Sequence, residues 1–378
     1  MADTSETVKL LVDPQGTDCA DPTYATILQH LARVKSSVEI HMFVWRSDQI
    51  GNEVAHALLA AAERGVRFHI KKDMTAIMFE RNEMNGKSLF NKAIPWYQSL
   101  HHKLIRLGFP NTYVEDDNSS TLGDRLMDHA NGKFEWPSDT HTKYFIFDDK
   151  TMLTGSINIE DRHRRYFDYM VALESPDLIA RFRERQTGAV PIDRERSIEF
   201  VTNRRHTDGR DVFEIKPIVL DLISSASESI YVEMAYLGDP DITAALIHAA
   251  RCGIAVTLFM SRAANIGNDL NYAVMNEIMH KSPTRIVLSE TMIHAKLFLF
   301  DNRIACFGSA NASIFCMQKA VELNLLIQNE TAFLSELRDL IARRLATGQE
   351  VSDVAELRDY RSWLASLEWL HQKLVSRA

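Results

Sequence analysis

The sequence contains the stretch His141-Thr142-Lys143-Tyr144-Phe145-Ile146-Phe147-Asp148, which is followed by Gly155-Ser156-Ile157-Asn158. The same pattern returns as His294-Ala295-Lys296, then Asp301, then Gly308-Ser309-Ala310-Asn311. In both copies His and Lys are two positions apart, Asp follows Lys by five, and Gly-Ser-x-Asn begins seven positions after Asp. Chance does not readily supply two copies with identical internal spacing. The pattern therefore indicates a duplicated unit with a shared chemistry.

The segments around each copy also occur in the same order. Apolar spacing and β-branched residues predict, in the first half, a strand at 8–12, a helix at 23–34, a strand at 38–45, a helix at 51–64 and a strand at 66–70. The second half predicts a helix at 217–224, a strand at 230–237, a helix at 242–252 and a strand at 254–260. A repeat this long exceeds the period of solenoid proteins, so it indicates duplication of a whole domain.

This order of elements predicts the fold class. Strands that alternate with helices indicate two similar α/β sandwich domains, each with a mixed, mainly parallel sheet flanked by helices, packed about a pseudo-twofold axis. We expect a first domain at 1–200 with a long insertion at 74–140, a second domain at 201–330, and a helical tail at 331–378.

Two regions outside the repeat allow alternative interpretations. The insertion at 74–140 includes a predicted helix near 94–107 and leads directly into His141. We favour a lid or substrate wall over a surface loop, because long loops are usually functional or disordered. The tail contains an apolar helical stripe, for which core packing is favoured over an interface. Its residues are Trp363, Leu367, Trp369 and Leu370.

Composition restricts the class of protein. The net charge of -8 argues against a surface built broadly for nucleic acid, although it allows a local basic cleft. The four cysteines lack metal-binding spacing. Cys306 and Cys316 sit in apolar surroundings, where we expect buried free thiols in a reducing compartment. The first residues lack the pattern of a signal peptide, and no apolar run reaches the ~18 residues of a membrane span. We expect a cytoplasmic protein whose membrane contact, if it has any, is peripheral.

The chemistry of the repeated pattern suits a phosphate group. On a strand, residues two apart share a face, so each His and Lys should project together. Asp148 and Asp301 fall in predicted hairpin turns, where a structural role is favoured over a catalytic one. A histidine, a fixed cation, and Ser and Asn donors match a nucleophile or acid with binding groups for phosphoryl oxygens. The pattern lacks the carboxylate clusters that bind Mg²⁺ or Ca²⁺, so we expect neither metal nor cofactor.

The complete pattern, present twice, resembles the two motifs of the phospholipase D superfamily. The resemblance implies that both motifs meet at the domain interface in one active site, and that catalysis is metal-independent and passes through a covalent phosphohistidine. It assigns His141 as the nucleophile and His294 as the general acid and base. The lysines and asparagines would hold the phosphoryl oxygens, with Gly155, Ser156, Gly308 and Ser309 as further substrate-binding groups. The predicted oxygen-binding residues are Lys143, Asn158, Lys296 and Asn311.

The resemblance also implies an acidic residue about ten positions beyond each motif asparagine, where it orients a catalytic histidine. Asp168 and Glu322 stand ten and eleven positions beyond Asn158 and Asn311. A solvated or structural acid is the alternative. The basic run at 162–165 is equally open to two interpretations, a solvated face or a binding site for phosphate or an anionic headgroup.

The resemblance leaves three candidate classes of function. The segment Phe43–Gly51 and the alanine-rich helix after it look most like the bacterial cardiolipin synthase branch, which implies a phospholipid substrate at a membrane surface. Such enzymes transfer a phosphatidyl group to an alcohol, and simple hydrolysis, as in phospholipase D, remains open. The alternatives are a metal-independent nuclease of the same superfamily and a non-catalytic phosphate-binding scaffold. Intact His and Lys in both motifs argue against the scaffold.

Overall fold

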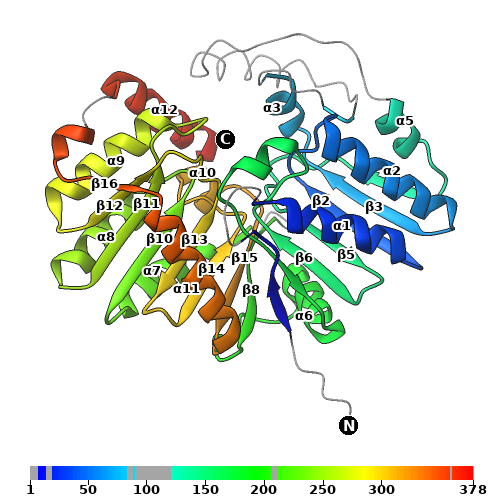
Figure 1. Cartoon of the computed structure of the whole chain (residues 1–378), viewed down its shortest axis with the longest axis horizontal. Helices are drawn as coiled ribbons and strands as arrows, with labels where there is room; N and C mark the ends of the chain where they lie inside the picture. Colours follow the sequence, from blue (N-terminus) through cyan, green and yellow to red (C-terminus); the bar gives the residue numbers. More distant parts are fainter. Residues whose placement is uncertain are drawn as a thin grey trace. The chain divides into compact units, whose positions relative to one another are not determined.

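The computed structural model describes residues 7–13, 19–82, 88–90, 121–205, 211–357 and 360–377. Contacts within the chain divide it into two compact units, which Figure 1 colours along the sequence. The first unit contains Met1–Asp13, Thr17–Arg164 and Met170–Arg181, and the second includes Arg165–Tyr169 and Phe182–Ala378. The predicted pair of α/β domains with mixed sheets flanked by helices is confirmed.

The first unit is built on a sheet with strand order β1-β7-β6-β5-β2-β3-β4. Its strands are β1 (Val8–Leu10), β2 (Ser37–Met42), β3 (Arg67–Lys72), β4 (Gly132–Glu135), β5 (Tyr144–Phe147), β6 (Thr151–Gly155) and β7 (Met170–Leu173). Its helices are α1 (Asp21–Arg33), α2 (Gln49–Glu63), α3 (Ala76–Asn82), α5 (Thr121–Met127), the 3-10 helix η2 (Asp161–Arg165) up to Arg164, and the first part of α6 (Pro176–Thr187).

The second unit is built on a sheet with strand order β16-β12-β11-β10-β13-β14-β15-β8-β9. Its strands are β8 (Ile198–Arg204), β9 (Val212–Phe213), β10 (Ser229–Met234), β11 (Ala255–Ser261), β12 (Arg285–Ser289), β13 (Lys296–Phe300), β14 (Ile304–Gly308), β15 (Glu322–Gln328) and β16 (Gln349–Glu350). Its helices are α7 (Ile215–Ser225), α8 (Pro240–Arg251), α9 (Asn268–Lys281), α10 (Ile314–Gln318), α11 (Thr331–Ala346), α12 (Ser362–Arg377) and the 3-10 helix η3 (Val354–Leu357).

The prediction of mainly parallel sheets is wrong. In the first sheet the pairs β2–β3 and β3–β4 are parallel, and in the second sheet β10–β11 and β11–β12 are parallel. The other pairs of named strands in the described residues are antiparallel. Short turns after β5 and β13 reverse the chain directly, and an antiparallel pair needs no helical crossover.

Corresponding helices begin and end alike in the two units. Helix α2 is capped by Asp48, whose side chain accepts from the Gly51 N–H, and α8 is capped by Asp239. Each helix is followed by a glycine with positive φ, 93° at Gly65 and 95° at Gly253. Glycine adopts this conformation without a steric penalty, so both helices stop there and the next parallel strand begins.

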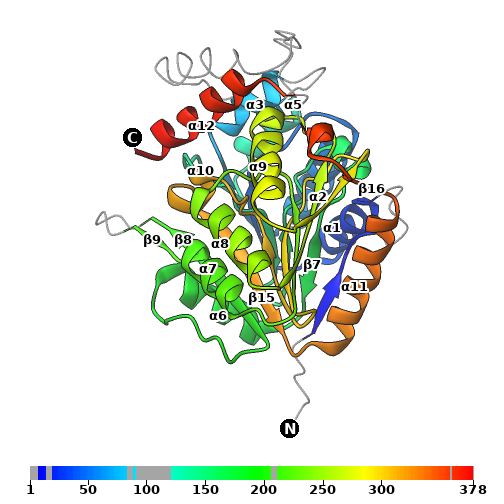
Figure 2. The same ribbon diagram turned by 90° about the vertical axis from the view of Figure 1, so that its left-hand side faces the viewer.

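The second sheet buries side chains on both of its faces. Ile230, Val232 and Met234 of β10 belong to the core cluster that includes apolar residues of α7, α8 and α9. Tyr231 and Glu233 alternate with them and therefore face the opposite side of the strand. Figure 2 shows α7, α8 and α9 beside one another, with α11 on the other side of this sheet.

The structure revises one prediction about the boundary between the two domains and one about the C-terminal tail. Strand β8 pairs with β15 in the second sheet, so the division between the units falls before β8 and not after residue 200. Within α12, Trp369 packs partly buried against the core, but Trp363, Leu367 and Leu370 are 62%, 51% and 45% exposed. Core packing is therefore wrong for these three residues. Spacing gives one helical face without saying what covers it.

The described part of the insertion belongs partly to the sheet. Strand β4 pairs in parallel with β3, and α5 precedes it. Strand β4 gave no strand signal in the sequence, because it is an edge strand with one exposed and three partly buried residues. Residues 83–87 and 91–120, with the predicted helix near 94–107, lie outside the described residues.

Candidate active site

In the first unit, His141 and Lys143 lie in the segment that enters β5. The Lys143 side chain is fully buried, and its Nζ donates a 2.6 Å hydrogen bond to the main-chain carbonyl of His141. The ring of Phe43 packs against both groups. Its centroid lies 4.6 Å from the His141 ring centroid and 5.1 Å from Lys143 Nζ. The imidazole and the ammonium are therefore held beside one another.

Strand β6 returns the chain to these residues, since β5 and β6 are antiparallel neighbours. At its end, the Gly155 N–H donates to the Lys143 carbonyl at 3.4 Å, and the buried Ser156 follows. The structure thus brings the Gly-Ser segment of the first motif next to its lysine.

The two motif asparagines are both buried. Asn158 Oδ1 accepts from the Val44 N–H at 3.2 Å, and its Nδ2 lies 3.2 Å from His163 Nε2. Asn311 Nδ2 lies 3.8 Å from Cys316 Sγ, and its Oδ1 has no hydrogen-bond partner among the described residues. The first amide is fixed by the backbone of the first unit, whereas the second keeps an acceptor available.

Three residues of the basic run after the first motif contact acidic side chains. His163 Nε2 lies 2.9 Å from Glu160 Oε1, and Arg162 Nε lies 2.6 Å from Glu160 Oε2. Arg164 pairs with Asp21. His163 and Glu160 are fully buried, so the solvated-face interpretation is wrong for His163.

In the second unit, His294 and Lys296 repeat the arrangement of the first motif. Lys296 Nζ donates to the His294 carbonyl, as Lys143 Nζ does to the carbonyl of His141. The Lys296 side chain is buried, and burial lowers its pKa from 10.5 to about 8 although the charge of Asp168 acts in the opposite direction.

Asp168 contacts the histidine of the other copy of the pattern. Its Oδ2 lies 2.8 Å from His294 Nδ1, and the carboxylate is fully buried. The neighbouring Phe167 carbonyl accepts from the N–H groups of His294 at 2.8 Å and Ala295 at 3.0 Å, which fixes the two segments together. A carboxylate at Nδ1 favours the tautomer that carries its proton on Nδ1. This is the contact that the predicted orienting role requires.

Glu322 and Ser309 form another buried pair in the second unit. Ser309 Oγ donates to Glu322 Oε2 at 2.5 Å. A Cβ at Gly308 would lie 2.2 Å from the Leu323 carbonyl oxygen. The closeness of β15, and not of a ligand, therefore explains glycine at this position. An orienting role of Glu322 toward a histidine stays a prediction.

Asp148 and Asp301 lie in the turns after β5 and β13, with φ of 52° and 49°. The Asp148 carboxylate accepts from the backbone N–H groups of residues 35–37, and that of Asp301 from those of residues 227–229. Partial burial acts to raise each pKa, but these bonds and a serine hydroxyl together lower the pKa of both carboxyls to about 2. Each aspartate therefore ties a motif turn to the start of the neighbouring strand.

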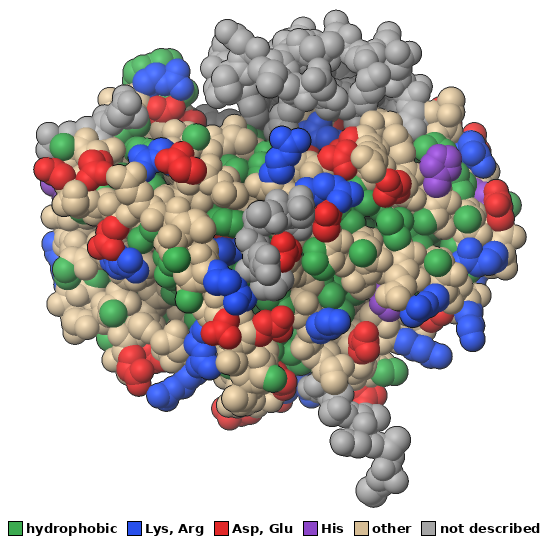
Figure 3. All heavy atoms as spheres, in the orientation of Figure 1, with side chains coloured by type: hydrophobic (Ala, Val, Ile, Leu, Met, Phe, Trp, Pro, Cys, Tyr) green, Lys and Arg blue, Asp and Glu red, His purple; other side chains and the backbone are tan. Residues whose placement is uncertain are grey.

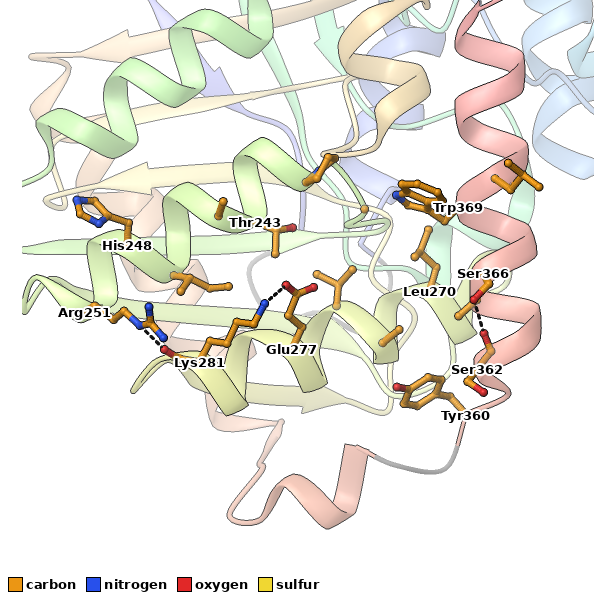
Figure 4. A pocket seen from close by; sticks show the side chains of 18 residues that line it. Thr243, His248, Arg251, Leu270, Glu277, Lys281, Tyr360, Ser362, Ser366 and Trp369 are labelled. Atoms are coloured by element: carbon orange, nitrogen blue, oxygen red, sulfur yellow. Dashed lines mark hydrogen bonds and ion pairs between the residues drawn. The ribbon is translucent and has the colours of Figure 1, made fainter.

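A groove of about 770 Å³ in the second unit is separate from these residues (Figure 4). Residues of α8, α9 and α12 form most of its lining, which includes no residue of either motif. Its basic side chains are already bonded, Lys281 to Glu277 and Arg251 to the Lys281 carbonyl. The groove therefore supplies no part of the predicted chemistry.

Among the residues that the structure describes, no helix combines the length and the apolar character needed to cross a bilayer.

Comparisons with known proteins agree with the motifs. A family model described as cardiolipin synthase, PLD-like domain, matches residues 27–186 and 219–345. Cardiolipin synthase A of Proteus mirabilis (strain HI4320) is 25% identical over 362 residues, covering 86% of this chain and 68% of that protein. Cardiolipin synthase B of Salmonella typhi is 23% identical over 348 residues, covering 84% and 77%.

A solved structure shares the fold of the whole chain. Phosphatidylserine synthase from Haemophilus influenzae Rd KW20 has a TM-score of 0.68 at 12% identity, covering 98% of this chain and 94% of that chain. Because the family model matches more than half of the sequence and includes both copies of the pattern, this chain belongs to the phospholipase D superfamily, in the family of cardiolipin synthase PLD-like domains.

Proposed function

We propose that this protein transfers the phosphatidyl group of one phospholipid to the alcohol of a second lipid, as a cardiolipin synthase does, or to water. The observation that carries the proposal is the duplicated arrangement of the motif residues. In each unit a buried lysine donates to the carbonyl of the motif histidine, and Gly-Ser-x-Asn ends the returning strand.

The first step forms a covalent intermediate. His141 attacks phosphorus, and the bond from phosphorus to the leaving alcohol breaks. His294 gives a proton to the departing oxygen, and Asp168 stabilises the protonated imidazole before this transfer. The products of this step are a free alcohol and a phosphatidyl-histidine.

The second step reverses these roles. His294 takes the proton of the incoming alcohol or water, whose oxygen attacks phosphorus and releases His141. Lys143, Lys296 and the two motif asparagines bind the non-bridging oxygens, where negative charge develops in the transition state. The buried lysines strengthen this interaction because little water screens them.

A turnover assay tests the proposal. The purified protein is given labelled phosphatidylglycerol vesicles in EDTA, beside labelled single-stranded DNA, with His141→Ala and Asp339→Asn as variants. Wild type and Asp339→Asn, whose exposed residue lies on α11, should convert lipid at the same rate. In the His141→Ala variant the rate of lipid turnover should fall by at least about 10³-fold, as expected when a nucleophile is removed.

The products distinguish the two acceptors. Cardiolipin and glycerol identify transfer to a second lipid, whereas phosphatidic acid identifies hydrolysis. Sedimentation of the protein with the vesicles measures the peripheral membrane contact that a phospholipid substrate requires. Lipid turnover that needs a metal, or that survives in His141→Ala, contradicts the proposed chemistry.

A metal-independent nuclease is the alternative function. Binding to a nucleic acid backbone usually requires a basic face. Over the face of the molecule drawn in Figure 3, Lys and Arg side chains are mixed with Asp and Glu side chains. The net charge of -8 also disfavours this alternative. Cleavage of DNA without any lipid turnover would establish the nuclease in place of the transferase.

A further inference from the structure

A buried ion pair lies behind the Asp168–His294 contact. Arg344 of α11 is 2% exposed, and its Nη1 donates to Glu233 Oε1 at 2.7 Å. Its Nη2 donates to the main-chain carbonyl of Asp168 at 2.8 Å. One guanidinium therefore bridges a strand of the second sheet and the residue that contacts the histidine.

The same guanidinium holds both neighbours of Asp168. It lies 4.8 Å from the ring centroid of Phe167 and 4.5 Å from that of Tyr169, distances at which cation–π attraction is effective. The Tyr169 hydroxyl donates to Glu233 Oε2 at 2.6 Å. Arg344 and Glu233 thus contact every residue of the segment 167–169. The contacted groups are the Phe167 ring, the Asp168 carbonyl, and the ring and hydroxyl of Tyr169.

A further tyrosine completes the coordination of Glu233. The Tyr231 hydroxyl donates to Glu233 Oε2 at 3.1 Å. Burial, followed by the charge of Glu233, raises the pKa of Tyr231 well above its usual value, so the hydroxyl stays protonated as a donor. The carboxylate therefore has three donors, from Arg344, Tyr169 and Tyr231.

The first unit has a histidine where the second unit has the carboxylate of this ion pair. Val38–Met42 of β2 aligns with Ile230–Met234 of β10, so His41 occupies the position that corresponds to Glu233. His41 stacks on Tyr144 at 4.1 Å, and burial, the largest effect, lowers its pKa to about 4, so it is neutral. The first unit builds the same strand without an arginine–carboxylate pair at this site.

We propose that Arg344 and Glu233 are positioning residues that fix Asp168 against His294, and so determine which His294 nitrogen carries the proton. The inference rests on the proposed function, in which His294 Nε2 exchanges protons with the alcohols. If the segment 167–169 shifts, the carboxylate leaves Nδ1, and part of the histidine population holds its proton on Nε2. That tautomer cannot accept a proton from the incoming alcohol.

The test uses two variants that preserve folding in different ways. Arg344→Lys keeps the charge beside Glu233, but an ammonium lacks the planar fork that reaches the Asp168 carbonyl as well. Arg344→Met with Glu233→Gln removes both charges together, which avoids an uncompensated buried charge. The matched control is Arg343→Lys, at the exposed neighbouring arginine of the same helix. Thermal unfolding selects the variants that retain the wild-type transition.

The decisive readout is long-range ¹H–¹⁵N NMR of the imidazole rings, with the His294 signal identified by its loss in His294→Gln. The spectra are recorded at alkaline pH, where the His294 ring is neutral and its tautomers can be distinguished. There, wild type and Arg343→Lys should show a single tautomer protonated at Nδ1. Both Arg344 variants should show a mixture of tautomers, as should Asp168→Asn. With lipid substrate, kcat should fall about ten-fold in the Arg344 variants while KM changes little.

A folded Arg344→Lys or double variant that retains the single Nδ1-protonated tautomer overturns the inference. The NMR signature does not depend on turnover. If the Arg344 variants lose the single tautomer and the wild-type protein does not turn over lipid, the positioning role is supported and the proposed function is rejected.

Discussion

At the scale of single residues, Lys296 is the group whose environment predicts a measurable pH dependence. Burial lowers its pKa to about 8, so the ammonium is protonated below that pH and neutral above it. If the cation binds phosphoryl oxygens in the transition state, kcat/KM should fall as the pH rises through about 8. Lys296→Met should lose about 10²–10³-fold of the rate at all pH values, since it removes the charge.

The control for this pH dependence is Lys296→Arg, measured in the same pH series with phosphatidylglycerol vesicles. Arginine stays protonated throughout this pH range. The fall of kcat/KM at alkaline pH should therefore disappear in this variant, even if its altered geometry makes it slower. An alkaline limb that is unchanged in Lys296→Arg would assign the limb to another group.

Single residues also show how far sequence reasoning reaches. The position of Asp168 relative to Asn158 predicted an acid that orients a histidine, and the structure has its carboxylate on His294 Nδ1. Arg344 gave no such signal, because it lies 176 positions from Asp168 within a helix whose other residues look like an ordinary amphipathic pattern. Only packing of α11 on the sheet brings the two together.

At the scale of elements, the motif turns are stabilised by carboxylates that the reaction does not use. The folded-state pKa of Asp301 is about 2, below its ordinary value of 3.8. The ionised group therefore contributes stability at pH values above about 4, and that contribution is lost as the pH falls toward 2. A neutral side chain at this position should weaken the turn at neutral pH.

Asp301→Asn tests this role, because asparagine tolerates the positive φ of the turn while it removes the charge. We expect the free energy of unfolding to fall by about 1 kcal/mol at pH 7, measured by urea denaturation. The difference from wild type should shrink between pH 4 and pH 2. Asp339→Asn on the exposed face of α11 should change little, and an equal loss there would remove the turn explanation.

Elements differed in how well the sequence predicted them. Helices α2 and α8 were predicted because their apolar faces and terminal glycines are local signals. The sheets as a whole were wrongly predicted to be mainly parallel, because the alternation of helices and strands was given more weight than the hairpin turns predicted between the motif strands. Those strands are joined by turns at Asp148 and Asp301 and pair antiparallel. Strand β4 was missed because pairing with β3, and not apolar alternation, defines it.

At the scale of the whole molecule, the duplication was predicted from the repeated motif and the aligned segments before it. The division between units was not, because Arg165–Tyr169 follows the first motif in sequence but belongs to the second unit. Backbone hydrogen bonds between Phe167 and residues 292–295 explain why this segment belongs to the second unit. The acid that follows the first motif thereby reaches the histidine of the second.

The central claim is a covalent phosphatidyl group on His141, and rapid-quench labelling tests it most directly. Enzyme mixed with phosphatidylglycerol labelled at phosphorus is quenched in base within one turnover, because phosphohistidine survives base, and is then mapped by peptide mass spectrometry. The account predicts label on the peptide that contains His141, absent in His141→Asn and formed more slowly in His294→Asn. Label on His294, or product formation in the first turnover without any labelled protein, would contradict it.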